Sequence, residues 1–304
     1  MNAPPPVPPA DGLRVLLFGH DGQLGTALRR TAPSGLEWVA PDWREADFTD
    51  PEGLRGWFRE RPDVVVNAAA YTDVDRAEDE EDVARLVNAE APRVLAEEAA
   101  RCGAALVHVS TDYVFPGEGD RPLREDDPTG PLGAYGRTKL AGERAVLESD
   151  ARAVVLRTSW LYSPHGRNFV KTMLAAGRER PELAVVADQW GCPTAADDLA
   201  RAVWTVVARG LEPAGLFHFA GAGATTWHAF AEAVFEEARR LGHVLAVERV
   251  RPIATEEWPT PARRPRWSVL DCSRIREAHG IEPPPWRDSL RRVVGELLTQ
   301  ATPC

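Results

Sequence analysis

The sequence is poor in cysteine, and this scarcity excludes two classes of small protein. Its four cysteines stand far apart along 304 residues, and no two of them have the spacing of a zinc-ligand pair. A chain of this length buries enough apolar surface to fold without disulfide staples. We therefore expect free thiols in a reducing compartment, and hence a cytoplasmic protein.

Long apolar runs and a basic stripe are also missing. No stretch of 18 apolar residues occurs, so we expect no membrane-spanning helix and no membrane partner. Residues 1–12 are rich in proline and lack the pattern of a secretion signal, which favours an extended tail. The net charge is −10, and one dense basic cluster occurs, at residues 263–266. Its three arginines are too few for a nucleic acid polymer but enough for one diphosphate.

The first half of the sequence contains a regular alternation of short apolar runs and helical segments. We expect buried strands at residues 13–18, 36–40, 63–67, 104–109 and 153–157. Helices are predicted at residues 22–30, 51–60, 78–100 with a break at Pro92, and 132–149. Such β-α repeats with short loops are typical of an α/β fold with a Rossmann-type, doubly wound parallel sheet.

After Trp160 the alternation becomes irregular. We expect helices at residues 168–178, 195–208, 226–241 and 286–298, and a short strand at residues 216–219. No linker of low complexity separates this part from the first. The interpretation is therefore a Rossmann domain over residues 13–160 and, over residues 161–304, mainly a smaller C-terminal lobe packed on it.

Three glycines, Gly19, Gly22 and Gly25, stand between the first strand and the first helix. Glycine lets the backbone turn sharply and approach a pyrophosphate, whose charge the N-terminus of a helix favours. The spacing G-x-x-G-x-x-G differs from the commoner G-x-G-x-x-G, and a plain turn is the alternative. Its place after the first buried strand favours a dinucleotide site.

The second strand is followed by residues of both charges. Asp42 is suited to hold an adenine ribose, whereas Arg44 is suited to meet a ribose 2′-phosphate. The choice between NADH and NADPH therefore stays open. Asp47 and Phe48 are candidates to cover the adenine, although a solvated loop explains their charge equally well.

Tyr135 and Lys139 stand four residues apart on a predicted helix and so share one of its faces. A tyrosine has a pKa near 10, and a neighbouring ammonium lowers that pKa and makes the phenol a better acid–base group. Thr111 follows the fourth strand, at the sheet edge where ligands of such folds bind. A hydroxyl there can hydrogen-bond a substrate carbonyl. The alternative is a surface pair on the helix.

These motifs together resemble the extended short-chain dehydrogenases. The segments that carry the resemblance are FGHDGQLG (18–25), VNAAAYTDVD (66–75), STDYVF (110–115), PLGAYGRTKLAGE (131–143), RTSWLY (157–162), NFVKTM (168–173) and PTPARRPRWSVL (259–270). The resemblance implies an enzyme in which NADPH or NADH delivers a hydride to the C4 keto group of a dTDP-sugar. Tyr135 would protonate the oxygen, and Lys139 would lower the phenol pKa and bind the nicotinamide ribose. The sequence departs from the family pattern at Trp267, where a small polar residue is usual.

The resemblance also implies roles for further residues. It assigns the cofactor to the glycine turn and the strand ends: Gly19, Gly22, Gln23, Leu24, Gly25, Asp42, Asp47, Phe48, Ala69, Ala70, Tyr71, Thr72, Tyr135 and Lys139. It assigns the sugar to Thr111, Asp112, Tyr135 and Trp160. The bidentate geometry of arginine separately suggests that at least one of the three clustered arginines, with Arg263 as the candidate, meets the substrate diphosphate. No metal ligands can be identified, so a magnesium requirement and a homodimer built around it stay open.

Two alternative functions share these residues. One is another nucleotide-sugar 4-ketoreductase of deoxysugar biosynthesis. The other is a non-catalytic protein similar to the regulatory subunits of methionine adenosyltransferase, which bind NADP. The presence of Thr111, Tyr135 and Lys139 favours an enzyme.

Overall fold

A computed structural model describes residues 12–300 of the chain. Residues 1–11 of the predicted proline-rich tail and the fourth cysteine, Cys304, lie outside the described residues. Within residues 12–300, no helix is both long enough and apolar enough to pass through a membrane.

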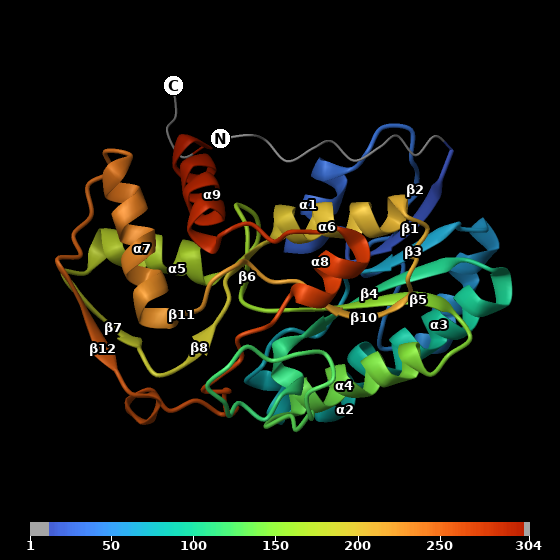
Figure 1. The fold of residues 1–304 in the computed structure, drawn as a ribbon, viewed down its shortest axis with the longest axis horizontal. Coiled ribbons are helices and arrows are strands. Elements are labelled where there is room, and N and C mark those ends of the chain that lie inside the picture. The colour runs from blue at the N-terminus through green and yellow to red at the C-terminus, as the bar shows by residue number, and fades with distance from the viewer. Residues whose placement is uncertain (1–11, 301–304) are drawn as a thin grey trace.

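Six parallel strands form the central sheet, in the order β10-β5-β4-β3-β1-β2. They are β1 (Arg14–Phe18), β2 (Glu37–Val39), β3 (Val64–Asn67), β4 (Ala105–Thr111), β5 (Arg152–Thr158) and β10 (Gly215–His218). All four residues of β3 are buried, as expected for a strand covered on both faces. The predicted α/β fold with a doubly wound parallel sheet is confirmed, and each predicted strand is present (Figure 1).

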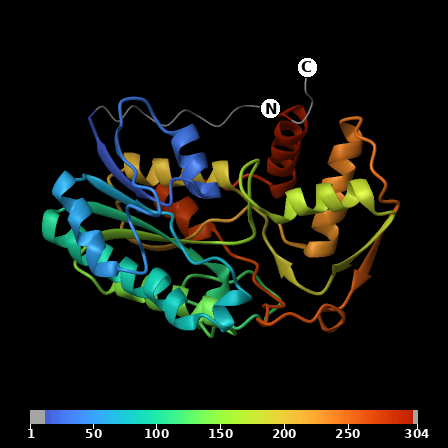
Figure 2. The ribbon, with the colours of Figure 1, turned by 180° about the vertical axis from the view of Figure 1, so that it is seen from behind.

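Helices cover both faces of this sheet (Figures 1 and 2). One face packs against α1 (Gln23–Thr31) and α6 (Ala196–Ala208), and the other against η1 (Pro51–Glu60), α3 (Ala91–Cys102) and α4 (Ala134–Leu147). Both β10 and α6 come from the chain beyond residue 160. The second half of the sequence therefore completes the sheet and one of its helix layers, in addition to building the lobe.

The predicted break at Pro92 takes a milder form. The chain runs through η2 (Arg76–Glu78), α2 (Glu81–Arg85) and a π-helical turn, η3 (Leu86–Glu90), directly into α3. Pro92 occupies the first turn of α3, where a missing N–H costs little. The wider π turn before it thus takes the place of a break.

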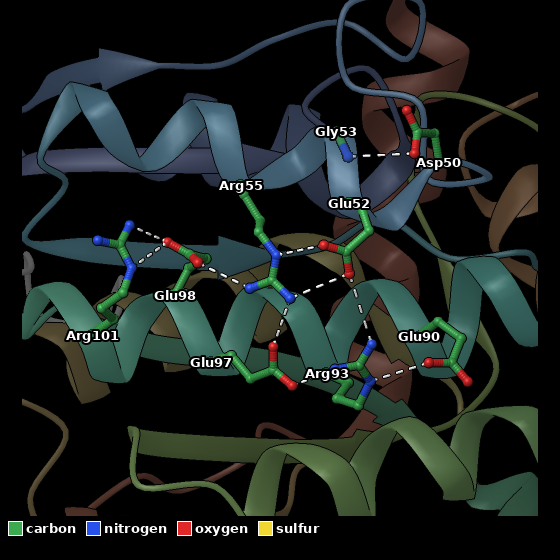
Figure 3. A network of polar contacts seen from close by, with 9 residues as sticks. All are labelled: Asp50, Glu52, Gly53, Arg55, Glu90, Arg93, Glu97, Glu98 and Arg101. Atoms are coloured by element: carbon green, nitrogen blue, oxygen red, sulfur yellow. Dashed lines mark hydrogen bonds and ion pairs between the residues drawn. The ribbon is translucent and has the colours of Figure 1, made fainter.

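Arginine–glutamate pairs join η1 to α3 on the outer surface (Figure 3). The guanidinium of Arg55 donates to Glu52 on its own element and to Glu97 and Glu98 on α3, at 2.7–2.9 Å for the closest pair with each. The predicted helix at residues 51–60 is a 3-10 helix, with Asp50 as its N-cap. Because long 3-10 helices are rare on their own, these tertiary contacts are what we expect to sustain it.

The lobe is built from α5 (Phe169–Glu179), α7 (Trp227–Arg240), α9 (Trp286–Gln300) and a two-stranded parallel sheet of β7 (Glu182–Val186) and β12 (Arg249–Ile253). Short strands connect it to the rest: β6 (Leu161–Tyr162), β8 (Trp190–Gly191), β9 (Thr194–Ala195) and β11 (Thr225–Thr226). Two 3-10 turns, η4 (Asp112–Val114) and η5 (Thr255–Glu257), and α8 (Ser273–His279) complete the described elements. The lobe helices were predicted, whereas β7, β12 and α8 were not.

Candidate active site

The glycine turn after β1 brings three backbone segments into close contact. Gly19 has a φ of +77°, and a Cβ there would lie 2.7 Å from the backbone nitrogen of Ala69. A Cβ on Gly25 would lie 2.0 Å from the Gly19 carbonyl oxygen. Gly22 is the N-cap of α1, whose first turn holds no acidic residue. The turn therefore presents an open, positively polarised helix end, which fits the pyrophosphate of a dinucleotide.

Two turn residues point away from this helix end. Leu24 is buried among the core residues beneath α1, so only its backbone is available to a ligand. The Gln23 side-chain oxygen accepts hydrogen bonds from Ser163 Oγ at 3.1 Å and Asn168 Nδ2 at 2.9 Å. Gln23 thus ties the turn to the segment between β6 and α5.

A cavity opens beside the turn. Its lining includes the predicted Asp42, Asp47, Phe48, Ala69 and Ala70, together with Phe18, Gly19, Asp21, Pro41, Trp43, Ala46, Thr49 and Val87. The structure thus brings together the residues predicted for the adenosine end. Sequence reasoning missed Trp43, which is 67% exposed. An aromatic residue directly after Asp42 was the available signal.

Asp42 and Arg44 differ in how far they are already engaged. The Asp42 carboxylate accepts the backbone N–H groups of Arg44 and Glu45 at 2.7 and 3.0 Å, and these bonds lower its pKa. The Arg44 guanidinium lies over the Trp43 ring, 5.0 Å from its centroid. Asp42 therefore serves first as a turn cap, while Arg44 stacks on the exposed edge of the cavity.

The segment after β3 is braced by Asn88. Its side chain accepts from the Tyr71 N–H at 2.9 Å, and donates to the Tyr71 carbonyl and to Thr138 on α4. The Tyr71 hydroxyl donates to Glu80 at 2.7 Å, and Thr72 is exposed. The backbone of this segment is therefore fixed close to the Tyr135 helix.

Thr111, Asp112 and Tyr135 meet at the carboxyl end of β4. Thr111 Oγ1 donates to Asp112 Oδ1 at 3.1 Å and accepts from the Tyr113 N–H. Burial raises the pKa of Tyr135 to about 12, against the lowering effect of a hydrogen bond with Thr111. Burial likewise raises the pKa of Asp112 to about 6. Near neutral pH the tyrosine is thus an un-ionised phenol, able to donate its proton.

Lys139 lies one turn beyond Tyr135 and is fully buried. Its Nζ donates to the Val109 carbonyl at 2.6 Å. Burial lowers its pKa to about 8, while the carboxylate of Glu143 opposes that change. The sequence predicted an ammonium that lowers the Tyr135 pKa; in the structure the strongest influence on both groups is burial.

Trp160 has a left-handed backbone, with a φ of +47°. Its ring stacks on Trp227 with centroids 3.6 Å apart, and a Cβ on Gly191 would lie 2.5 Å from it. Left-handed backbone is costly for an aromatic residue and concentrates at functional sites. The stack fixes the orientation of the Trp160 indole just beyond the end of β5.

The three clustered arginines have different partners. Arg264 pairs with both oxygens of Asp75, at 2.7 and 2.6 Å, and Arg266 pairs with Glu256. Arg263 is exposed and makes no ion pair within residues 12–300. The diphosphate role predicted for Arg263 stays a prediction, and its charge is free to serve it. Across the same residues, no three His, Cys, Asp or Glu side chains gather as metal ligands.

Known proteins resemble the chain along nearly its whole length. The chain is 46% identical over 296 residues to the dTDP-4-dehydrorhamnose reductase of Shigella flexneri, covering 94% of this chain and 99% of that protein. Among solved structures, the Clostridium acetobutylicum dTDP-4-dehydrorhamnose reductase has a TM-score of 0.88 at 38% identity, over 94% of this chain and 99% of that one. The enzyme of the same name from Bacillus anthracis, solved in complex with NADP, has a TM-score of 0.87 at 36% identity, with the same coverage.

A family model gives the same result. The model described as the RmlD substrate binding domain matches residues 13–299, which includes the glycine turn, the Tyr135 helix and the lobe. With that match, and with relatives above 40% identity over nearly their full length, the chain belongs to the RmlD substrate binding domain family.

Proposed function

We propose that this protein reduces the C4 keto group of dTDP-4-dehydro-L-rhamnose to give dTDP-L-rhamnose, using NADPH or NADH. Membership of the RmlD family and the names of its relatives support this substrate. The complex of the Bacillus anthracis relative with NADP supports a nicotinamide cofactor. The open end of α1 and the cavity beside it fit such a dinucleotide.

The observation that carries the proposal is the meeting of Thr111, Tyr135 and Lys139 at one edge of the sheet. Thr111 ends β4, and the other two lie on one face of α4. The Thr111 hydroxyl acts on the Tyr135 phenol and lowers its pKa against the effect of burial. A hydroxyl pair of this kind can bind a carbonyl oxygen and protonate it, which is the acid half of a ketone reduction.

The reaction balances with one hydride and one proton. When bound, the cofactor supplies the hydride to C4. The Tyr135 phenol donates its proton to the C4 oxygen as negative charge develops there, and the product carries a hydroxyl. The Thr111 hydroxyl orients the same oxygen. Because burial keeps the pKa of Tyr135 at about 12, the proton is present on the phenol throughout the neutral range.

Residues around the turn would hold the cofactor. Gly19, Gly22 and Gly25 let the pyrophosphate approach the N-terminus of α1, and Asp42, Asp47 and Phe48 line the adenosine cavity. We propose that Lys139 contacts the nicotinamide ribose from α4. We propose that Asp112 and Trp160 contact the sugar, and that Arg263 meets the diphosphate.

The test is a direct assay with enzymatically prepared dTDP-4-dehydro-L-rhamnose and NADPH, repeated with NADH. We expect loss of the nicotinamide absorbance with formation of dTDP-L-rhamnose, and the two rates rank the cofactors. Binding of NADPH without turnover would overturn the proposed substrate. Reduction of a different nucleotide-linked 4-keto sugar in the same assay would then identify the related ketoreductase.

A further inference from the structure

Glu143 lies one turn beyond Lys139 and two turns beyond Tyr135 on α4. Residues spaced by four share a helix face, so the three side chains form one row. Glu143 is 2% exposed, which makes it a buried carboxylate beside the proposed catalytic pair. A buried charge is costly unless it is paired and hydrogen-bonded, so its partners indicate its role.

Both oxygens of Glu143 have partners. Oε1 pairs with Nη2 of Arg157 on β5, and Oε2 accepts from Arg157 Nε and from Ser110 Oγ, each at 2.9 Å. Arg157 is itself buried, and its guanidinium lies 4.9 Å from the ring centroid of Phe115. The bidentate geometry fixes the Glu143 carboxylate more firmly than a single contact would.

The end of β4 contacts this row at two adjacent residues. Val109 offers its carbonyl to Lys139, and Ser110 donates to Glu143. The helix face is therefore docked on the strand through two neighbouring polar contacts. The second contact belongs to a residue that the proposed mechanism does not use.

We propose that Glu143 is a positioning residue for Lys139: its carboxylate, fixed by Arg157 and Ser110, keeps the Lys139 side chain a buried ammonium directed at the Val109 carbonyl. This deepens the proposed function and rests on it. It explains why the buried ion pair of Glu143 and Arg157, which the proposed mechanism does not use, lies one helical turn from Lys139.

The charges facing Lys139 agree with this role. Burial and Lys139 itself keep the pKa of His108 on β4 well below its usual value, so His108 is neutral. Tyr135 is also neutral, and Arg157 lies behind the Glu143 carboxylate. Asp112 raises the pKa of Tyr135, and its own pKa is raised to about 6 by burial. The Glu143 carboxylate, one helical turn away on the same buried face, raises the Lys139 pKa against the effect of burial, so we expect its removal to lower that pKa.

The sequence offers an unusually direct test, because Lys139 and Lys171 are its only lysines. With ¹³C-labelled lysine, two side-chain signals can be followed against pH by NMR and assigned with Lys171→Arg. In Glu143→Gln we expect the Lys139 midpoint to move about one pH unit lower, with Lys171 unchanged. Glu148→Gln removes an exposed charge at the end of the same helix and is the matched control.

A second variant keeps the proposal testable if Glu143→Gln does not fold. Glu143→Leu with Arg157→Met removes both members of the buried ion pair, so neither is left without the other, and such replacements usually fold. The Lys139 midpoint should fall in this variant too, whereas unfolding would raise it toward the ordinary lysine value. A folded variant with an unchanged Lys139 midpoint would overturn the proposal.

A kinetic measurement separates this proposal from the proposed reaction. The alkaline limb of kcat/KM should move to lower pH in Glu143→Gln by the same amount as the NMR midpoint. A shifted midpoint in a protein that reduces no keto sugar would leave the role of Glu143 standing and reject only the substrate. A normal reductase whose midpoint does not move would reject the role of Glu143 alone.

Discussion

Tyr135 is the residue on which the proposed chemistry depends most. Tyr135→Phe keeps the ring and its edge contact with Tyr113 but removes the proton. We expect kcat to fall by about 100-fold or more, while NADPH affinity measured by its fluorescence stays within about twofold of wild type. Turnover close to wild type would show that another group protonates the sugar oxygen.

Asp112 is a residue of the proposed site whose burial lowers the stability of the folded protein. Its pKa is about 6 in the folded protein, against an ordinary value of 3.8. Between these values the unfolded chain loses a proton that the folded protein keeps, so the free energy of unfolding falls as pH rises through this window. Above pH 6 the ionised side chain costs about 3 kcal/mol at most.

Asp112→Asn should therefore raise Tm at pH 7.5 and have little effect at pH 4, where both side chains are neutral. Asp120→Asn, at an exposed position, is the control and should change neither. Thermal unfolding at the two pH values measures both variants. An equal gain at pH 4 would mean that packing, and not ionisation, stabilises the asparagine variant.

At the scale of elements, the contact between β1, α1 and the segment after β3 depends on missing side chains. A Cβ on Gly25 would overlap the Gly19 carbonyl oxygen at 2.0 Å, whereas a Cβ on Gly22 would lie 3.4 Å from the same atom. Gly25→Ala should cost about 2 kcal/mol or more of unfolding free energy, and Gly22→Ala less than about 1 kcal/mol. Urea unfolding compares the two. Equal costs would show that α1 can move away from the turn.

At the scale of the whole molecule, Gln23 connects the glycine turn to the segment that leads into the lobe. Gln23→Leu keeps the volume but removes the acceptor for Ser163 and Asn168. Hydrogen exchange in residues 163–168 should become about tenfold faster, since roughly one hydrogen bond's free energy is lost. Gln189→Leu, which removes a bond to Thr255, should leave that segment unchanged. Equal protection in both variants would mean that other contacts secure the segment.

The sequence allowed the sheet to be predicted better than the lobe, for a physical reason. Runs such as residues 63–67 are apolar on both faces and adjoin their helices, so local pattern sufficed. The pairing of β7 with β12 joins residues 182–186 to residues 249–253, and β12 contains a proline and two arginines. No local pattern reveals a partner that distant.

The site divides in the same way. Spacing predicted Tyr135 and Lys139 on one helix face, and the β-α order predicted Thr111 at a strand end, because both are local features. The exposed ring of Trp43 and the buried pair of Glu143 with Arg157 depend on which segments meet after folding. Charge patterns in sequence rarely distinguish such a buried pair from two solvated side chains.

The stacked rings of Trp160 and Trp227 also have an optical consequence. Two indoles 3.6 Å apart and inclined by only 9° interact strongly in their excited states, so their near-ultraviolet circular dichroism and emission differ from those of isolated tryptophans. Any ligand that shifts the ring of Trp160 changes this coupling. The protein therefore carries an intrinsic spectroscopic reporter at the wall where the sugar is proposed to bind, and occupancy can be read without a label.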